Sequence, residues 1–397
     1  MFWKLGRSLK IISLGRFING FCRFPLYTIL TLYYFEIFHL GYLDIGLIFT
    51  ISGGFSILAS LYGGYISDKI GRKTIIIASC LIVIVSSALM FIISSAISLE
   101  IPFIAFSMLI NLGSSLQRPA LSSAITDLSD EEQRVAAFSI NRITSNAGIG
   151  IGLVLAGVAW TLSPSLFFLI TASGTTIELL LYLIFVPETY KKKEDEVIAK
   201  HRFVSNDKPL LTISLFLSFA LLFSQQWLTS VFPLYMTRYD SLSVEEITVL
   251  YSINTVIVVV LQGFASKIIS AIGELKAFSL GSVLFGIGYF LFGFLTLYIE
   301  LIAVVILISF GENLTIIIPQ IIVSKISPPH RRGEFFGTNS AISGMFFALS
   351  PLVGTSLLTI FIFDPRLTWI FLSVVSVAIL AGIPLISRQI TRKEPSA

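Results

Sequence analysis

Long runs of apolar residues, separated by short polar breaks, fill almost the whole chain. A helix needs about 20 apolar residues to cross the hydrocarbon core of a bilayer, and twelve runs reach that length. In the first half, these predicted spans lie near Lys10 to Phe38, Leu43 to Ser67, Thr74 to Leu99, Ile101 to Thr126, Val135 to Leu162 and Ser165 to Val186. In the second half they lie near Pro209 to Thr237, Glu246 to Ile269, Leu275 to Tyr298, Leu301 to Val323, Gly333 to Phe361 and Thr368 to Ser387.

The polar breaks also predict how the chain is divided. The longest hydrophilic stretch, residues 188–208, separates six spans from six further spans. We therefore expect an N-terminal six-helix bundle at 1–187, a cytoplasmic linker at 188–208 and a C-terminal six-helix bundle at 209–397. Two repeats of this kind, related by pseudo-twofold symmetry, are typical of transporters that rock about a site at the membrane midplane. The expected fold class is an all-α integral membrane protein.

Composition supports a membrane protein. Hydrophobic residues make up 55% of the chain and charged residues 13%, with a mean hydropathy of +0.90. The first run lacks a small-residue cleavage site, so we expect it to remain as a span. The two cysteines lie inside apolar runs and the three histidines lie near helix ends or in loops. We therefore expect no disulfide, no metal site and no cofactor.

The placement of lysine and arginine predicts the orientation. With the amino terminus inside, nearly all basic loop residues fall in cytoplasmic segments, and only Arg238 and Arg366 fall outside. Both termini are then cytoplasmic in a multi-pass protein of the plasma membrane. The net charge of +4 follows from this asymmetry and gives no reason to expect a nucleic-acid partner. The expected partners are a small-molecule substrate, protons and the lipid bilayer, and we expect a monomer.

Three arginines fall inside predicted spans, where charge is expensive and usually faces a partner or a watery cavity. They are Arg23, Arg118 and Arg142. Helical spacing places Arg23 on one face with Asn19 and Tyr27, and Arg118 on one face with Asn111. The alternative is that each arginine only joins neighbouring helices through hydrogen bonds.

Two acids lie well inside spans, Glu178 and Glu312. Glu312 is followed by Asn313 and is the better candidate for proton coupling, because desolvation favours the neutral form of a carboxyl. Such a group can take up a proton on one side of the membrane and release it on the other. For Glu178 we predict a local packing role, because only Thr175 and Thr176 accompany it.

The loop between the second and third spans reads G-x-x-x-D-K-x-G-R-K and resembles the signature of the major facilitator superfamily. The matching residues are Gly64, Asp68, Lys69, Gly71, Arg72 and Lys73. The resemblance implies that Asp68 and Arg72 belong to a cytoplasmic charge cluster that acts as a conformational switch. Asp127, at the end of the fourth span, resembles the acid that completes this cluster.

Two further segments resemble the drug/proton antiporters of this superfamily. Span five carries Gly148, Gly152 and Gly157, although Leu153 replaces the proline of the antiporter element and Ala156 replaces a glycine. Close helix packing alone also explains these glycines. In span ten, the pair Gly311-Glu312, followed by Pro319, looks like the acid-bearing helix of the MdtH-like and LmrP-like multidrug/proton antiporters.

Two modes of secondary transport by alternating access remain open. In the favoured one, proton-coupled antiport exports amphipathic, often cationic compounds (multidrug efflux), which bind aromatic walls such as Tyr27, Tyr34 and Trp227. In the other, Arg23 and Arg118 bind a small organic anion that enters with protons through symport. Further polar residues assigned to the substrate cavity are Gln225, Gln226, Asn254 and Asn313.

An enzyme is disfavoured, because the sequence has no zinc-protease helix, no serine-nucleophile elbow and no nucleotide-binding loop. A receptor on the same fold that binds without transporting stays open.

Overall fold

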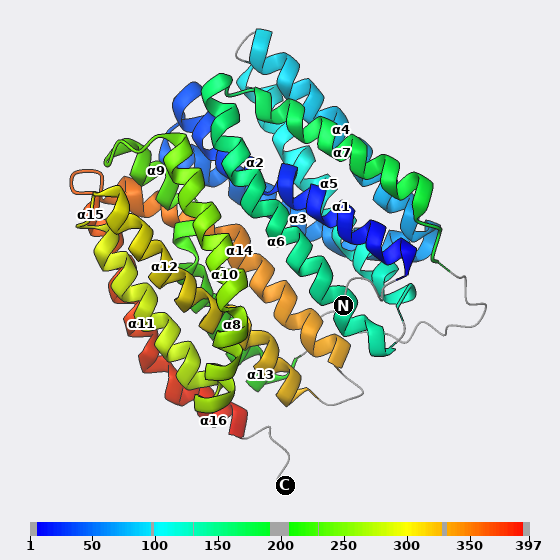
Figure 1. Ribbon diagram of the computed structural model, residues 1–397. Helices are drawn as coiled ribbons and strands as arrows, with labels where there is room; N and C mark the ends of the chain where they lie inside the picture. Colours follow the sequence, from blue (N-terminus) through cyan, green and yellow to red (C-terminus); the bar gives the residue numbers. More distant parts are fainter. Residues whose placement is uncertain are drawn as a thin grey trace. The chain divides into compact units, whose positions relative to one another are not determined.

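The computed structural model describes residues 6–96, 99–129, 131–190, 206–228, 230–327 and 332–391 (Figure 1). Within these ranges every regular element is a helix and none is a strand, so the predicted fold class is confirmed. Most of the predicted linker at 188–208 lies outside the described residues.

The chain separates into two compact units. Unit 1 contains Met1–Lys193 and Ser241–Val256, and unit 2 contains Glu194–Asp240 and Ile257–Ala397. The helices of unit 1 are α1 (Arg7–Arg23), α2 (Pro25–Leu32), η2 (Tyr33–Ile37), α3 (Tyr42–Ile70), α4 (Arg72–Ala96), α5 (Glu100–Asp127), α6 (Glu131–Leu162) and α7 (Leu166–Phe185). Those of unit 2 are α8 (Lys208–Ser224), η3 (Gln226–Leu228), α9 (Val231–Arg238), α11 (Glu274–Phe292), α12 (Tyr298–Thr315), α13 (Ile318–Ile326), α14 (Arg332–Ile360), α15 (Arg366–Ala378), η5 (Ile379–Gly382) and α16 (Ile383–Thr391). The helix α10 (Val244–Ile272) begins in unit 1 and ends in unit 2.

Nine helical segments of the described residues are long and apolar enough to cross a membrane. The other three predicted spans correspond to α1–α2–η2, α5 and α8–η3–α9. Pro25 separates α1 from α2, because proline cannot donate the backbone hydrogen bond that a continuous helix needs. The helix α5 carries a polar stripe, and α8 is a shorter apolar helix. The three spans that are not formed by one long apolar helix are thus either broken or polar. Breaks and polar residues within spans are common at functional sites of membrane proteins.

Glycines set the close approach of α1 and α6 in unit 1. A Cβ on Gly148 would meet the backbone oxygen of Phe17, and one on Gly152 would meet that of Phe21. From the other side, Gly20 lies against the backbone oxygen of Ser145. These contacts support the packing interpretation of the span-five glycines. Gly157 lies further along α6, against Thr248 of the first half of α10.

Candidate functional site

A buried ion pair joins α1 to α7 in the interior of unit 1. Arg23 Nη2 lies 2.7 Å from Glu178 Oε2, and the two side chains are 4% and 0% exposed. An isolated buried charge is very costly, and here each group lies against the opposite charge of the other. The side chain of Arg23 is held inside the bundle.

Gln117 of α5 links both members of this pair. Its Oε1 accepts hydrogen bonds from Arg23 Nη1 at 2.7 Å and from Asn19 Nδ2 at 3.2 Å. Its Nε2 donates to Glu178 Oε1 at 3.1 Å, so each carboxylate oxygen has a donor. Thr175 of α7 accepts from Arg23 Nε at 3.4 Å, and Cys80 of α4 lies 3.7 Å from Arg23 Nη2. This buried polar cluster, made of these six residues, connects four helices.

The polar cluster concerns two sequence-based interpretations. Glu178 has partners on two other helices, Arg23 of α1 and Gln117 of α5, and its packing role stays a prediction. Arg23 and Asn19 are engaged with Gln117, and Arg23 also with Glu178, which favours the helix-joining interpretation of Arg23 over a substrate-binding one. Sequence reasoning missed Gln117, although it directly precedes Arg118 in a polar stretch of α5.

Arg118 differs from Arg23, because it is exposed, in the second half of α5. An arginine within a predicted span is expected to face a partner or water and not lipid. On the same helix, Asn111 donates to Ser52 Oγ of α3 at 2.9 Å. Arg142 of α6 is also exposed.

Two aromatic residues assigned to cavity walls are instead core residues. Trp227 is 0% exposed and packs against Phe232, with ring centroids 5.8 Å apart. Tyr34 is likewise fully buried, and its hydroxyl lies 2.5 Å from Ser107 Oγ. Their complete burial corrects the expectation that they line a cavity. Tyr27 remains half-buried and packs on Phe49 at 4.5 Å.

The remaining polar candidates lie in different surroundings. Gln226 is fully buried and donates to Ser350 Oγ at 3.1 Å, so it joins η3 to α14. Gln225 is half-buried, and its Nε2 has no hydrogen-bond partner among the described residues. Asn254 is 6% exposed, in the part of α10 that belongs to unit 1.

Glu312 lies in the last turn of α12 and is 7% exposed. The adjacent Asn313 is 4% exposed and donates to Ser309 O at 3.3 Å. The helix forms a membrane span together with α13, which begins after a break close to Pro319. A carboxyl buried within a span is a functional candidate by its position alone.

The predicted cytoplasmic charge cluster is present in part. Arg72 Nε lies 3.5 Å from Asp127 Oδ2, which joins α4 to the end of α5. Gly71 has φ of +108°, a conformation that favours glycine, and it separates α3 from α4. Gly64 lies within α3, close to Pro119 of α5. The side chain of Asp68 lies outside the described residues, so its place in this cluster stays a prediction.

Glu188, at the start of the linker, holds the same turn. Its Oε1 accepts from the backbone N–H of Arg72 at 2.9 Å, and its Oε2 accepts from that of Lys73 at 3.1 Å. The carboxylate therefore caps α4 and faces the positive end of the helix dipole. Lys73 Nζ also donates to Leu183 O at 2.7 Å. Sequence reasoning missed this cap, because more than a hundred residues separate Glu188 from the helix that it caps.

We expect Glu188→Ala to destabilise the turn at Gly71 by about 1 kcal/mol, because two amide donors of α4 lose their acceptor. The measurement is thermal unfolding of the purified protein in detergent. Thr189→Val is the matched control, because Thr189 contacts Asp127 but not the amides of α4. Equal melting temperatures for wild type and Glu188→Ala would mean that the cap contributes nothing.

A model of the Major Facilitator Superfamily matches residues 12–242 and 215–397. The chain belongs to the major facilitator superfamily. It is therefore a membrane transporter of the secondary kind and not an enzyme, as the sequence predicts. This confirms the resemblance first indicated by the loop signature around Gly71.

Relatives and solved structures agree with this assignment. The chain is 27% identical over 356 residues to the uncharacterized MFS-type transporter YqjV of Bacillus subtilis (strain 168), covering 86% of this chain and 83% of that protein. It is 25% identical over 369 residues to a Na(+), Li(+), K(+)/H(+) antiporter of Planococcus maritimus, covering 84% and 85%. A POT family transporter in complex with 5-aminolevulinic acid has a TM-score of 0.80 at 16% identity, covering 98% and 99%. A mutant of the nucleoside transporter NupG also has a TM-score of 0.80 at 16% identity, covering 96% and 98%, and both structures support the fold alone.

Proposed function

We propose that this transporter is a proton-coupled antiporter that exports amphipathic small molecules, with Glu312 as the proton-carrying group. The observation that carries the proposal is the burial of Glu312 inside α12, beside the buried Asn313. Low solvent access favours the neutral form of a carboxyl, and rehydration favours the ionised form. A change in access during the transport cycle would therefore load and release one proton.

The second intramembrane acid is poorly suited to this role. Both oxygens of Glu178 accept hydrogen bonds, and one of the donors is the Arg23 guanidinium. A proton carrier at this position would have to give up these hydrogen bonds in each transport cycle. Between the two acids, we therefore assign proton coupling to Glu312.

Antiport is favoured over anion symport for two reasons. The first is that Arg23, one of the two arginines expected to bind an anion, is paired with Glu178. The second is that a relative 25% identical to this chain is a Na(+), Li(+), K(+)/H(+) antiporter. Similarity at this level supports exchange against protons as a starting hypothesis, and it leaves the exported compound open.

Symport of a small organic anion is the second candidate, and the exposed side chain of Arg118 favours it. A guanidinium with access to water inside a membrane protein can bind a carboxylate or phosphate through two parallel hydrogen bonds. In this alternative, Glu312 would couple uptake of the anion to protons.

The two candidates predict pH changes of opposite sign in the same experiment. The protein is reconstituted into vesicles that contain a pH-sensitive dye and have an acidic interior. Antiport predicts that an external lipophilic cation makes the interior more alkaline as it enters in exchange for protons. Symport predicts that an external organic anion makes the interior more acidic. Exchange with Na⁺ alone, or no pH change with any compound, would refute export of amphipathic molecules.

Several expectations from the sequence stay part of this proposal. They are the domain boundaries at 187 and 208, cytoplasmic termini, residence in the plasma membrane and a monomeric state. Protease accessibility of the two termini in right-side-out vesicles tests the orientation directly.

A further inference from the structure

A pocket of about 330 Å³ opens at one end of unit 2. It lies where α9 ends, where α11 ends and where α15 begins. Its lining combines four aromatic residues, three small or apolar residues and two charged residues: Tyr235, Tyr239, Phe292, Phe294, Gly293, Thr296, Pro365, Asp240 and Arg366. The volume falls within the usual range for small-molecule sites. The proposed proton carrier Glu312 does not line it.

One carboxylate oxygen of the acid in this pocket has no hydrogen-bond donor among the described residues. Asp240 Oδ2 is buried and makes no hydrogen bond with the described residues. Its only described cationic neighbour in the lining, Arg366, instead holds Asp364 with two hydrogen bonds of 2.9 and 3.2 Å. Burying a carboxylate oxygen without a hydrogen-bond donor costs free energy. A cation bound in the pocket would offset this cost.

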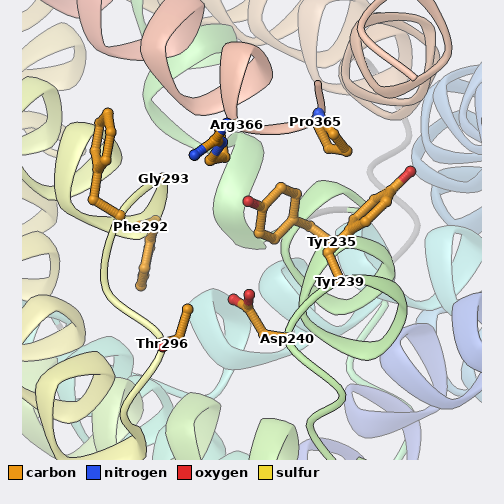
Figure 2. A pocket seen from close by; sticks show the side chains of 9 residues that line it. Tyr235, Tyr239, Asp240, Phe292, Gly293, Thr296, Pro365 and Arg366 are labelled. Atoms are coloured by element: carbon orange, nitrogen blue, oxygen red, sulfur yellow. The ribbon is translucent and has the colours of Figure 1, made fainter. Parts of the chain in front are cut away.

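The side chains that line the pocket determine which class of cation can bind there. Figure 2 shows the Asp240 carboxylate and the Tyr235 hydroxyl facing the same space, with Thr296 across from them. The Tyr235 ring lies 5.2 Å from the Tyr239 ring and 5.4 Å from the Trp369 ring. Aromatic faces attract organic ammonium ions, whereas an alkali ion prefers a shell of several oxygen ligands.

We propose that this pocket binds a small organic ammonium ion, with Asp240 as its counter-ion and with Tyr235 and the exposed Phe294 in its aromatic lining. The site is separate from the proton carrier and does not depend on the direction of transport. With the proposed orientation, it opens on the external side of the membrane. It would then be an external binding site for organic cations on the C-terminal bundle.

Binding at this site should depend on pH. Burial raises the pKa of Asp240 to about 6, so the carboxylate is ionised at pH 7.5 and mostly neutral at pH 5. The other titratable or charged groups around the pocket are Tyr235, Tyr239, Asp364 and Arg366. Tyrosine, paired aspartate and arginine do not change charge between these pH values. We therefore expect affinity for the ammonium ion to fall about tenfold from pH 7.5 to pH 5.

Maleimide labelling of the variant Thr296→Cys would report on binding in this pocket alone. Thr296 is exposed, whereas both native cysteines are buried. In detergent, Thr296→Cys is labelled with a neutral maleimide in the presence of increasing benzyltrimethylammonium. The expected result is protection from labelling, with a half-protecting concentration about tenfold higher at pH 5 than at pH 7.5. Benzoate, an anion of similar size, should give no protection.

Substitutions of Asp240 test whether its carboxylate is responsible for the protection from labelling. Adding Asp240→Asn should remove protection at pH 7.5, whereas Asp240→Glu should keep it together with its pH dependence. Glu36→Gln, at an exposed acid of η2, should leave protection unchanged. Glu312→Gln should also leave it unchanged, which separates this site from the proposed proton carrier. Equal protection at both pH values, or full protection in Asp240→Asn, overturns the proposal, and the first of these requires no variant beyond Thr296→Cys.

Discussion

Glu178→Leu is expected to lower the free energy of unfolding by about 3–5 kcal/mol, because it leaves the Arg23 guanidinium buried without its counter-ion. Arg23 and Glu178 are both almost fully inaccessible, so water cannot replace the lost carboxylate. Gln117 would keep one hydrogen bond to Arg23 but cannot neutralise its charge. The measurement is chemical unfolding of the purified protein in detergent, together with the yield of monodisperse protein.

The double variant Arg23→Met/Glu178→Leu separates charge burial from packing. Removing both charges removes the unpaired ion, so we expect this variant to recover most of the lost stability. Thr175→Val is a milder control, because it deletes the 3.4 Å hydrogen bond from Arg23 without removing a charge and should cost no more than about 1.5 kcal/mol. If the double variant is as unstable as Glu178→Leu, the ion pair does not account for the loss.

The fold could be predicted from the sequence because its main signals are local. The length of each apolar run, the polar breaks and the glycine of the turn at Gly71 act over a few residues each. The same holds for the break at Pro25, where one missing amide donor ends α1. Lysine and arginine placement adds an orientation, and the loop signature indicates the family. None of these signals depends on which helices are neighbours.

The polar cluster could not be predicted, because it depends on how the helices are arranged. Arg23 and Glu178 are 155 residues apart, and helical periodicity gives the face of each residue but not the helix opposite. In a membrane, moreover, lipid-facing and core-facing positions are both apolar. Hydrophobicity therefore does not distinguish a buried Trp227 from one that lines a cavity. The cap formed by Glu188 could not be predicted for a related reason, because a capping residue is expected immediately before the helix that it caps.

Glu312→Gln is expected to reduce proton-driven flux on the order of 100-fold, because an amide can fill the same space but cannot carry a proton. The protein should still fold, since glutamine keeps the shape and most hydrogen-bonding capacity of the acid. Flux is measured in vesicles under an imposed proton gradient. The matched control is Glu300→Gln, at the first turn of the same helix, which should transport at nearly the wild-type rate.

Exchange without a gradient distinguishes loss of coupling from loss of transport. With substrate on both sides of the vesicle membrane, a carrier that lacks its proton site can still exchange one substrate molecule for another. We therefore expect Glu312→Gln to retain this exchange and to lose its dependence on pH. If driven flux persists at the wild-type rate, the proton travels through another group. Because Glu178 is held by Arg23 and Gln117, we would then turn to acids outside the spans, beginning with Asp127 beside Arg72.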